Sequence, residues 1–335
     1  MTPKDPPEDR DTLVDRRTKL GVGGGKTKPT SDLVGQVAGG YLIEAELGAG
    51  AMGAVFRASH IDTNRVVALK ALHPHHLSEP SVVERFRREA KLASRLAHPY
   101  IGSVVEVVQA DDGRHMIVLE YVEGEPLSGI MTMPLPPERV TLLVRQLLLG
   151  LEYAHGAGLI HRDLKPDNVL VEWRNGRDHA RIVDFGIAIL RDAGDESLER
   201  LTATGQMIGT PLYMSPEQAK GEAMDHRTDL FSLGVMMFEM MTGVLPFEGR
   251  PLDILSASLT RDPPAMEKRV PNLLVEPLLE LFCRKLMQRD LTKRFAHARQ
   301  AIEVLDLITS DPAAAKLALG VMDVEKALDV VSLRR

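Results

Sequence analysis

The stretch His161-Arg162-Asp163-Leu164-Lys165-Pro166-Asp167-Asn168, with Asp184-Phe185-Gly186 further along the chain, decides how this sequence is interpreted. Apolar residues typical of strands, VLV and RIV, flank the two motifs. The side-chain oxygens of Asn168 and Asp184 therefore lie in two separate loops, and such oxygens are the ligands that a pair of hard cations on a polyphosphate requires. A lone Asp-Phe-Gly triplet is common, whereas an ordered eight-residue motif of this kind is not.

A glycine-rich segment, Gly48-Ala49-Gly50-Ala51-Met52-Gly53-Ala54-Val55, is the second chemical signal. Glycine allows backbone N–H groups to approach phosphate oxygens without a Cβ in the way. In dinucleotide-binding folds such a turn opens a helix, whereas here the chain continues as the strand-like AVFRAS. Taken alone, the segment fits a structural hairpin as well as it fits a phosphate-binding loop.

The third signal is Val67-Ala68-Leu69-Lys70, a lysine at the end of an apolar strand. Such a lysine is usually an edge residue that keeps its ammonium in water. It gains interest from Glu89 in the following helical segment, because that carboxylate could hold the ammonium toward a phosphate.

The composition bounds the class of protein. At 335 residues and 36.9 kDa, with 44% hydrophobic residues, the chain is long enough for two lobes or domains around a sizeable core. The 41 basic and 47 acidic residues give a net charge of −6, which argues against a generic DNA-coating protein. Eight Phe, five Tyr and one Trp also leave little for base stacking, so no nucleic-acid partner is expected.

The compartment is indicated by cysteine usage and by hydropathy. The single cysteine, Cys283, excludes an internal disulfide framework, and we expect it to be a buried helix residue and not a nucleophile. The first residues alternate charge and proline where an export signal needs an apolar run. The apolar segment 230–247 contains Ser232 and Glu239, so it is expected to be the centre of a large lobe. These features predict a cytoplasmic chain with no membrane segment.

The pattern along the chain predicts three parts. Residues 1–40, rich in Gly, Pro, Thr and mixed charge, are expected to form a flexible arm. From residue 41 strands and glycine turns alternate, with one helix expected over 81–97, and after residue 124 the pattern is mainly helical. Residues 309–335 are expected to form an amphipathic helical tail with the apolar stripe Leu317, Val321, Val324, Leu328 and Val331. Packing on the larger lobe is favoured over a coiled coil, because the repeat is short.

In order and spacing these motifs closely resemble those of the protein kinase family, especially the eukaryotic-like Ser/Thr kinases of bacteria. The resemblance covers residues 41–308 and includes the later landmarks Gly209-Thr210-Pro211, Ser215-Pro216-Glu217, Asp229 and Arg294. It implies an α+β, two-lobed kinase fold. The N-lobe (41–119) would be a small antiparallel sheet with one main helix, followed by a hinge (120–124) and a larger, mostly helical C-lobe (125–308).

The resemblance also implies that ATP binds between these lobes. The residues implied to contact the nucleotide are Leu47, Gly48, Gly50, Gly53, Val55, Ala68, Lys70, Glu120, Val122 and Leu170. Lys70 would grip the α and β phosphates and be positioned by Glu89, and Leu119 would be the gatekeeper. The backbones of Glu120 and Val122 would form hydrogen bonds with adenine.

The implied chemistry is transfer of the γ-phosphoryl group of ATP to serine or threonine hydroxyls of protein substrates. Asp163 would orient the hydroxyl and take its proton, and Lys165 would stabilise the transferring group. Asn168 and Asp184 would bind Mg²⁺, and Mn²⁺ could take its place. Lys165 and Thr210 resemble the Ser/Thr and not the Tyr branch of the family.

Regulation is suggested by Arg162, which precedes the implied catalytic aspartate. A phosphothreonine could pair with this guanidinium and order the activation segment. The family's usual acceptors align with Thr202 and Thr204, so autophosphorylation is expected there, with a homodimer considered for a reaction in trans. One departure is Ile189, where related kinases often carry a basic residue.

Two other functions remain open at this stage. The first is a pseudokinase, against which the intact Lys70, Asp163, Asn168 and Asp184 argue. The second is a small-molecule phosphotransferase of related fold, against which Thr210 and Ser215-Pro216-Glu217 argue, because that segment shapes a peptide-binding surface.

The remaining features are given structural interpretations. Asp229 and the pair Glu217–Arg294 are interpreted as scaffold. Ser215 replaces an alanine common in the family, and no consequence is expected. The group His73, His75 and His76 is interpreted as a solvated loop and not as a metal site.

Overall fold

The computed structural model describes residues 30–50, 53–73, 80–110, 113–185 and 211–321. The chain divides into two units, Met1–Asp32 and Leu33–Arg335, and the fold described below is that of the second unit.

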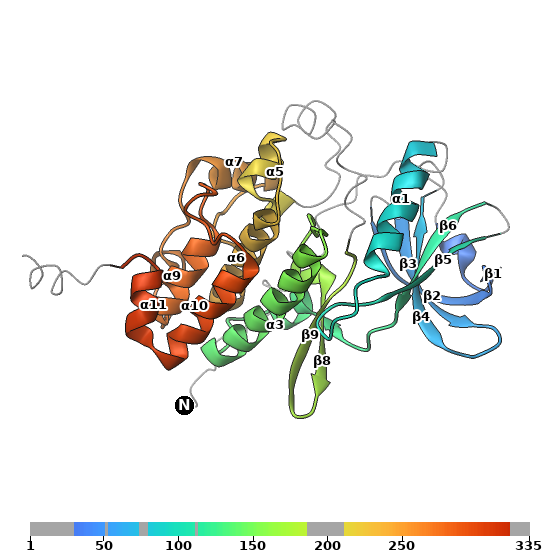
Figure 1. The fold of residues 1–335 in the computed structure, drawn as a ribbon, viewed down its shortest axis with the longest axis horizontal. Helices are drawn as coiled ribbons and strands as arrows, with labels where there is room; N and C mark the ends of the chain where they lie inside the picture. Colours follow the sequence, from blue (N-terminus) through green and yellow to red (C-terminus); the bar gives the residue numbers. More distant parts are fainter. Residues whose placement is uncertain (1–29, 51–52, 74–79, 111–112, 186–210, 322–335) are drawn as a thin grey trace, which may run out of the picture. The chain divides into compact units, whose positions relative to one another are not determined.

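The smaller lobe is built on a six-stranded antiparallel sheet (Figure 1). In spatial order its strands are β1 (Val37–Ala38), β2 (Tyr41–Gly50), β3 (Gly53–His60), β4 (Val66–Leu72), β6 (His115–Glu120) and β5 (Val104–Gln109). Burial alternates along β3 and β4, so one face carries the fully buried Phe56, Val67 and Leu69. The antiparallel sheet expected from the alternating pattern is confirmed.

The main helix of this lobe, α1 (Pro80–Ala93), packs on the opposite face of the sheet. Phe86 and Ala90 lie four residues apart and form one apolar cluster with Leu72 and Ile117. The helix ends at Ala93, earlier than the expected position 97.

The ordered lobe begins earlier than the expected boundary at residue 41. Thr30–Leu33 forms a short 3₁₀ helix, and Val37–Ala38 pairs with the start of β2. Leu33 and Ala38 are almost completely buried in the core of the sheet. The expectation of a flexible arm up to residue 40 is therefore wrong for residues 33–40, because two buried apolar side chains attach this segment to the sheet.

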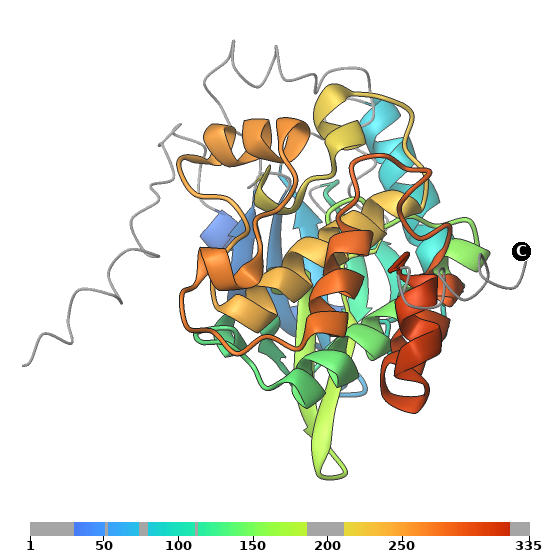
Figure 2. The same cartoon turned by 90° about the vertical axis from the view of Figure 1, so that its left-hand side faces the viewer.

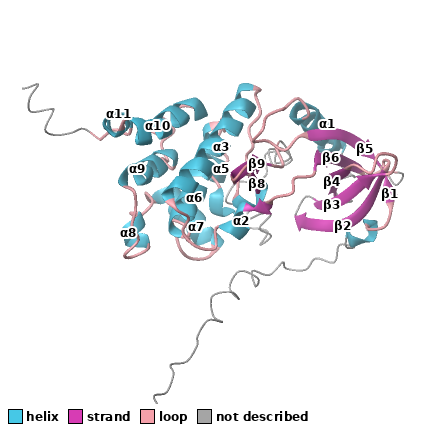
Figure 3. Ribbon diagram, turned by 90° about the horizontal axis from the view of Figure 1, so that it is seen from below, coloured by secondary structure: helices cyan, strands magenta, loops and turns pink. Residues whose placement is uncertain are grey.

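The larger lobe is mostly helical, with one three-stranded sheet. Its helices are α2 (Leu127–Ile130), α3 (Pro137–Gly156), α5 (Pro216–Lys220), α6 (Arg227–Thr242), α7 (Pro251–Thr260), α8 (Met266–Arg269), α9 (Pro277–Leu286), α10 (Ala298–Ser310) and α11 (Pro312–Ala318). Its strands are β7 (Glu125–Pro126), β8 (Val169–Arg174) and β9 (Arg177–Ile182). Figure 2 shows this lobe from the side of its helices, and Figure 3 separates its helices from the strands of the smaller lobe.

The centre of this lobe is α6, which contains most of the apolar segment singled out in the sequence. Every residue from Thr228 to Thr242 is buried. Its apolar character on all sides is therefore that of a central helix, as expected. No helix in the described part of the chain combines the length and hydropathy needed to cross a bilayer. Cys283 on α9 is also fully buried, and burial raises the pKa of its thiol, as expected for a packing residue.

The C-terminal tail differs from its expected form. α11 ends at Ala318, and Gly320 follows with a φ of +86°, a left-handed conformation that interrupts a continuous helix. Leu317, the first member of the expected apolar stripe, is 64% exposed, whereas Ala315 is the buried residue of α11. The other stripe members beyond Val321 lie outside the described residues.

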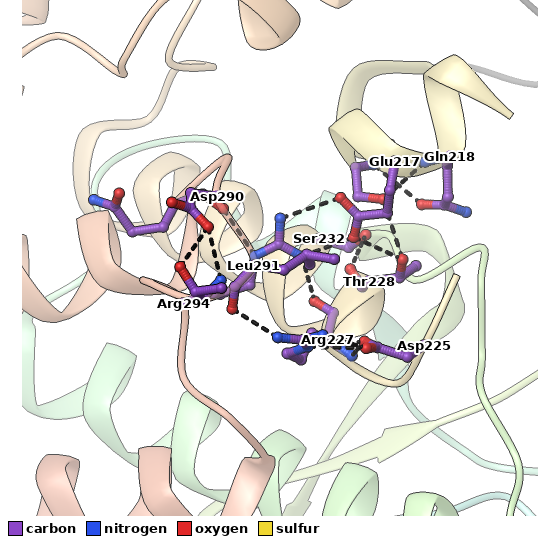
Figure 4. Close-up of polar contacts among 12 residues, drawn as sticks. Glu217, Gln218, Asp225, Arg227, Thr228, Ser232, Asp290, Leu291 and Arg294 are labelled. Atoms are coloured by element: carbon purple, nitrogen blue, oxygen red, sulfur yellow. Dashed lines mark hydrogen bonds and ion pairs between the residues drawn. The ribbon is translucent and has the colours of Figure 1, made fainter. Parts of the chain in front are cut away.

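A buried ion pair holds α5 onto the lobe (Figure 4). Nη1 and Nη2 of Arg294 donate to the carboxylate oxygens of Glu217 over 2.8 and 3.2 Å, and the Thr228 hydroxyl donates to the same carboxylate over 2.9 Å. Arg294 also donates to the carbonyl oxygens of Gln288 and Arg227. Three segments distant in sequence are thereby connected, which supports the scaffold interpretation.

Ser215 has a structural consequence that the sequence interpretation missed. It caps α5: its hydroxyl accepts a hydrogen bond from the Gln218 N–H, and the Gln218 side chain accepts one from the Ser215 N–H. The hydroxyl also contacts that of Thr228 at 3.2 Å. An alanine at this position would keep the backbone N–H bond to Gln218 but would lose the two contacts made by the hydroxyl.

Replacing Arg294 by methionine is expected to lower the free energy of unfolding by about 3–5 kcal/mol, because the Glu217 carboxylate would remain buried without its cation. Urea unfolding at pH 7 measures this loss. The matched control is Arg145→Met, which breaks an equally short pair with Asp306 on the exposed surface and should change stability much less. Equal losses in the two variants would contradict the scaffold role.

The same pair predicts a pH dependence. Burial raises the pKa of Glu217, but hydrogen bonding and the charge of Arg294 outweigh it and hold the pKa below its usual 4.5. The stabilisation is therefore present above pH 4.5 and is lost as the pH falls through the lowered pKa of the folded state. The stability difference between wild type and Glu217→Gln should accordingly shrink in acid, which thermal unfolding across a pH series would measure.

Candidate active site

The three glycines of the glycine-rich segment meet different surroundings at the β2–β3 turn. A Cβ on Gly53 would lie 1.9 Å from the carbonyl oxygen of Ala71 on the adjacent strand β4. Among the residues that the structure describes, a Cβ on Gly48 would meet nothing within 4 Å, and one on Gly50 only a backbone oxygen at 4.0 Å. Gly53 is therefore required by strand packing, whereas open space lies beside the other two glycines.

Lys70 and Asp184, which lie far apart in sequence, meet in the structure. Lys70 is on β4, and its Nζ donates to Oδ2 of Asp184, just beyond β9, over 2.9 Å. Their side chains are 13% and 22% exposed, so the pair is partly shielded from water. Glu89 lies on α1, but its side chain is outside the described part of the structure, so its pairing with Lys70 stays a prediction.

Beside Lys70, one face of the smaller sheet is apolar and only partly covered. Val55 pairs with Lys70 across β3 and β4, and Ala68 lies two residues before Lys70, so the three side chains share a face. All three are partly exposed, as is Leu170 on β8. Leu47 on β2 is about half exposed. A flat apolar ring could pack on this face next to an ammonium.

The octapeptide motif places Asp163 among polar side chains. Lys165 donates from Nζ to Oδ2 of Asp163 over 2.9 Å. The amide nitrogen of Asn168 donates to the backbone oxygen of Asp163 over 2.7 Å, which fixes the orientation of this buried side chain. Because the amide nitrogen of Asn168 donates to Asp163, the amide oxygen is the atom of this side chain that could bind a cation.

Asp184 and Asn168 have donor atoms that fit a magnesium ion. Mg²⁺ is usually held by one or two carboxylates together with substrate phosphates and water. One carboxylate and one amide oxygen, beside a lysine, match this pattern. Among the described residues, no group of three or more His, Cys, Asp and Glu side chains gathers in a metal-binding arrangement. His73 instead contacts the backbone oxygen of Gly50 at 2.8 Å, and His75 and His76 lie outside the described residues.

Asp229 on α6 fixes the backbone of the octapeptide motif, residues 161–168. Its two oxygens accept hydrogen bonds from the N–H groups of His161 and Arg162, each over 2.8 Å, and a third from Nε2 of His155 over 2.8 Å. Burial alone raises the pKa of this carboxyl. The hydrogen bond and charge of His155, together with the charge and backbone hydrogen bond of His161, outweigh burial, so the pKa is lowered. A fully buried carboxylate thus remains ionised.

Two residues of the site have a left-handed backbone. Arg162 and Asp184 each have a φ of +65°, a conformation that costs a residue other than glycine about 1–3 kcal/mol. The Asp229 carboxylate holds the first through its N–H. The second follows Val183, whose carbonyl oxygen accepts a hydrogen bond from the His161 ring over 2.9 Å. The His161 ring also packs edge-on against Phe185, with ring centroids 4.9 Å apart. The motifs therefore support one another.

A family model described as a protein kinase domain matches residues 41–304. The chain belongs to the protein kinase family. It is 44% identical over 278 residues to the serine/threonine-protein kinase pkn3 of Myxococcus xanthus, a match that covers 82% of this chain and 51% of that protein. It is 33% identical over 255 residues to the serine/threonine-protein kinase PrkC of Bacillus subtilis, covering 73% and 38% of the two chains.

Solved structures agree with this assignment. The crystal structure of the kinase domain of PknI from Mycobacterium tuberculosis superposes with a TM-score of 0.62 at 28% identity, and covers 81% of this chain and 97% of that domain. The chain spans about half, or less, of the length of the curated relatives that it matches. The expected resemblance to bacterial Ser/Thr kinases and the two-lobed α+β fold are confirmed.

The structure of the kinase domain also reveals contacts that the sequence interpretation missed. The Glu120 side chain, at the start of the expected hinge, is held by Arg181 on β9, and Leu119 before it is buried. No signal in the sequence links these two residues, because Arg181 reads as part of a strand. Thr202 and Thr204 lie outside the described residues.

Two glycine variants should separate packing from ligand contact. Gly53→Ala is expected to lower the free energy of unfolding by about 2 kcal/mol, because its Cβ would force β3 away from Ala71. Gly50→Ala should leave the unfolding temperature close to that of wild type and weaken binding of a non-hydrolysable ATP analogue with Mg²⁺. Thermal unfolding and calorimetric binding on the same samples check both. A Gly53→Ala protein as stable as wild type would contradict the steric argument.

Proposed function

We propose that this chain is a Ser/Thr protein kinase that transfers the γ-phosphoryl group of Mg-ATP to serine or threonine hydroxyls of proteins. The observation that carries the proposal is the meeting of Lys70 and Asp184 at 2.9 Å, with the Asp163, Lys165 and Asn168 group on the adjoining loop. In the proposed complex Lys70 binds the α and β phosphates, and the glycine-rich turn covers them.

Most of the catalytic effect is positioning and charge stabilisation, because the transferring group spreads negative charge over its equatorial oxygens. Asp163 accepts a hydrogen bond from the substrate hydroxyl and takes its proton, while Lys165 offsets charge on the phosphoryl group. Asn168 and Asp184 hold Mg²⁺, or Mn²⁺ in its place, which neutralises phosphate charge when bound. The hinge backbone at Glu120 and Val122 binds adenine.

The segment that begins at Pro211 favours a protein substrate over a small molecule. Gln218 on α5 donates from Nε2 to the backbone oxygen of Arg162 over 2.7 Å, so this segment is connected directly to the loop that carries Asp163. Its other side is fixed by the Tyr213 hydroxyl, which donates to Glu239 on α6 over 2.5 Å. A fixed platform beside the phosphoryl acceptor suits an extended peptide.

The remaining expectations belong to the same proposal. The catalytic domain comprises residues 41–308 with the preceding segment 33–40 attached to its sheet. A cytoplasmic location accords with the single buried cysteine. Homodimers would allow one protomer to phosphorylate its partner.

Phosphotransfer should depend on the Asp163 carboxylate. Asp163→Asn is expected to lower the rate of label transfer from radiolabelled ATP to generic basic protein by about 10²–10⁴-fold, since the asparagine cannot take the proton. Binding of the ATP analogue should persist. Asp253→Asn, an equally conservative change on the exposed surface, is the control. Equal labelling by wild type and Asp163→Asn would remove the catalytic assignment.

Autophosphorylation is expected on Thr202 and Thr204. Mass spectrometry after incubation with Mg-ATP should find phosphate on at least one of them, and none in the Asp163→Asn protein. Replacing both threonines by alanine should lower the activity, because Arg162 then has no phosphate to pair with. An active enzyme with both threonines unmodified would refute this control.

A further inference from the structure

Glu120, the first residue of the hinge, forms an ion pair with Arg181 of the larger lobe. Arg181 on β9 donates from Nη1 and Nη2 to the two carboxylate oxygens of Glu120 over 2.7 and 2.6 Å. The Arg181 side chain is only 7% exposed, whereas that of Glu120 is 32% exposed. Hydrogen bonding by Arg181 lowers the pKa of Glu120 against the opposing effect of burial, so this carboxylate is ionised at neutral pH.

The same guanidinium also reaches the segment between α1 and β5. Nη2 of Arg181 donates to the backbone oxygen of Ile101 over 3.0 Å. This segment runs parallel to β9, since Ile182 N–H donates to Tyr100 and Gly102 N–H donates to Ile182, over 2.9 and 2.8 Å. A Cβ on Gly102 would approach Val183 to 3.0 Å, so the close pairing favours glycine.

The segment 100–103 is in turn hydrogen-bonded to the hinge. The N–H of Glu120 donates to the backbone oxygen of Ser103 over 2.9 Å, and the N–H of Ser103 lies 3.4 Å from the Glu120 carboxylate. One guanidinium therefore joins the hinge, the segment 100–103 and the strand that leads into Asp184. A lysine could not do this, because one ammonium lacks the planar fork that reaches two acceptors on one side and a third on the other.

The end of β9 is itself hydrogen-bonded to the octapeptide motif through Val183. Val183 N–H donates to the backbone oxygen of Asn168 over 2.9 Å, so the short chain between Arg181 and Asp184 has little freedom. On its other side the hinge is braced by Arg57 of β3, whose guanidinium lies 5.7 Å from the ring centroid of Tyr121. Arg181 is thus the side chain that connects the Glu120 carboxylate directly to the strand leading into Asp184.

We propose that Arg181 is a positioning residue that fixes the spacing between the hinge and Asp184, and thereby prepares the site for a nucleotide that touches both. This inference rests on the ATP-binding function proposed above. Adenine would bind at the hinge and the metal-bound phosphates at Asp184, so only a ligand with both parts benefits from a fixed spacing. Without Arg181, such a ligand must itself order the two ends, which weakens its binding.

The test compares two ligands on the full chain. Arg181→Met is expected to weaken binding of Mg²⁺ with the non-hydrolysable analogue AMP-PNP about tenfold, and that of adenosine less than about twofold, because adenosine touches only the hinge. Arg181→Lys should give an intermediate loss, and it decides the proposal by the same comparison if the methionine variant does not fold. The KM for ATP should rise more than kcat falls.

The matched control is Arg139→Met. Arg139 also forms a bidentate pair, with Asp178 at the other end of β9, at 2.7 and 3.1 Å. It should change stability without separating the two ligands. Equal weakening of adenosine and AMP-PNP by Arg181→Met would show that Arg181 only shapes the hinge, and unchanged or tighter AMP-PNP binding would equally overturn the proposal. Failure of wild type to bind either ligand would instead refute the proposed nucleotide-binding function.

Discussion

A single buried carboxylate, that of Asp229, holds the chemistry of this kinase domain together. It is fully buried in the larger lobe and accepts hydrogen bonds from two backbone N–H groups of the octapeptide motif and from the His155 ring. Because the loop backbone is fixed, the His161 ring reaches Val183 and Phe185, and these residues orient Asp184. Asp184 then meets Lys70 from the smaller lobe. These contacts form a continuous series from Asp229 to Lys70, so the residues of the site are connected to one another.

Short-range patterns explain why much of the fold, and the grouping of the octapeptide residues on one loop, could be predicted from the sequence. The octapeptide motif places Asp163, Lys165 and Asn168 within one loop, where their contacts follow from local geometry. The alternating apolar residues of β3 and β4 similarly require a half-buried sheet, and the uniformly apolar α6 requires a central position. In each case the period of the pattern matches that of one element.

The expectations that failed depend on context that a local pattern does not carry. Leu33 and Ala38 belong to the sheet because a two-residue strand finds a partner in β2, and a segment rich in glycine and charge gives no sign of it. The tail has a regular apolar stripe, yet Gly320 adopts a left-handed backbone after α11. Arg181 and Glu120 are 61 residues apart, so only the folded chain brings them together. Long-range contacts between polar residues leave no period in the sequence.

The glycines of the glycine-rich segment differ in their surroundings. Gly53 is excluded from bearing a side chain by the backbone of β4, whether or not a nucleotide binds. Gly48 and Gly50 meet no such obstacle from the residues that the structure describes. Among the described residues, the space beside Gly48 and Gly50 leaves their backbone open to a ligand, whereas Gly53 is occupied by strand packing. The motif alone does not separate these two situations, because it fits a hairpin equally well.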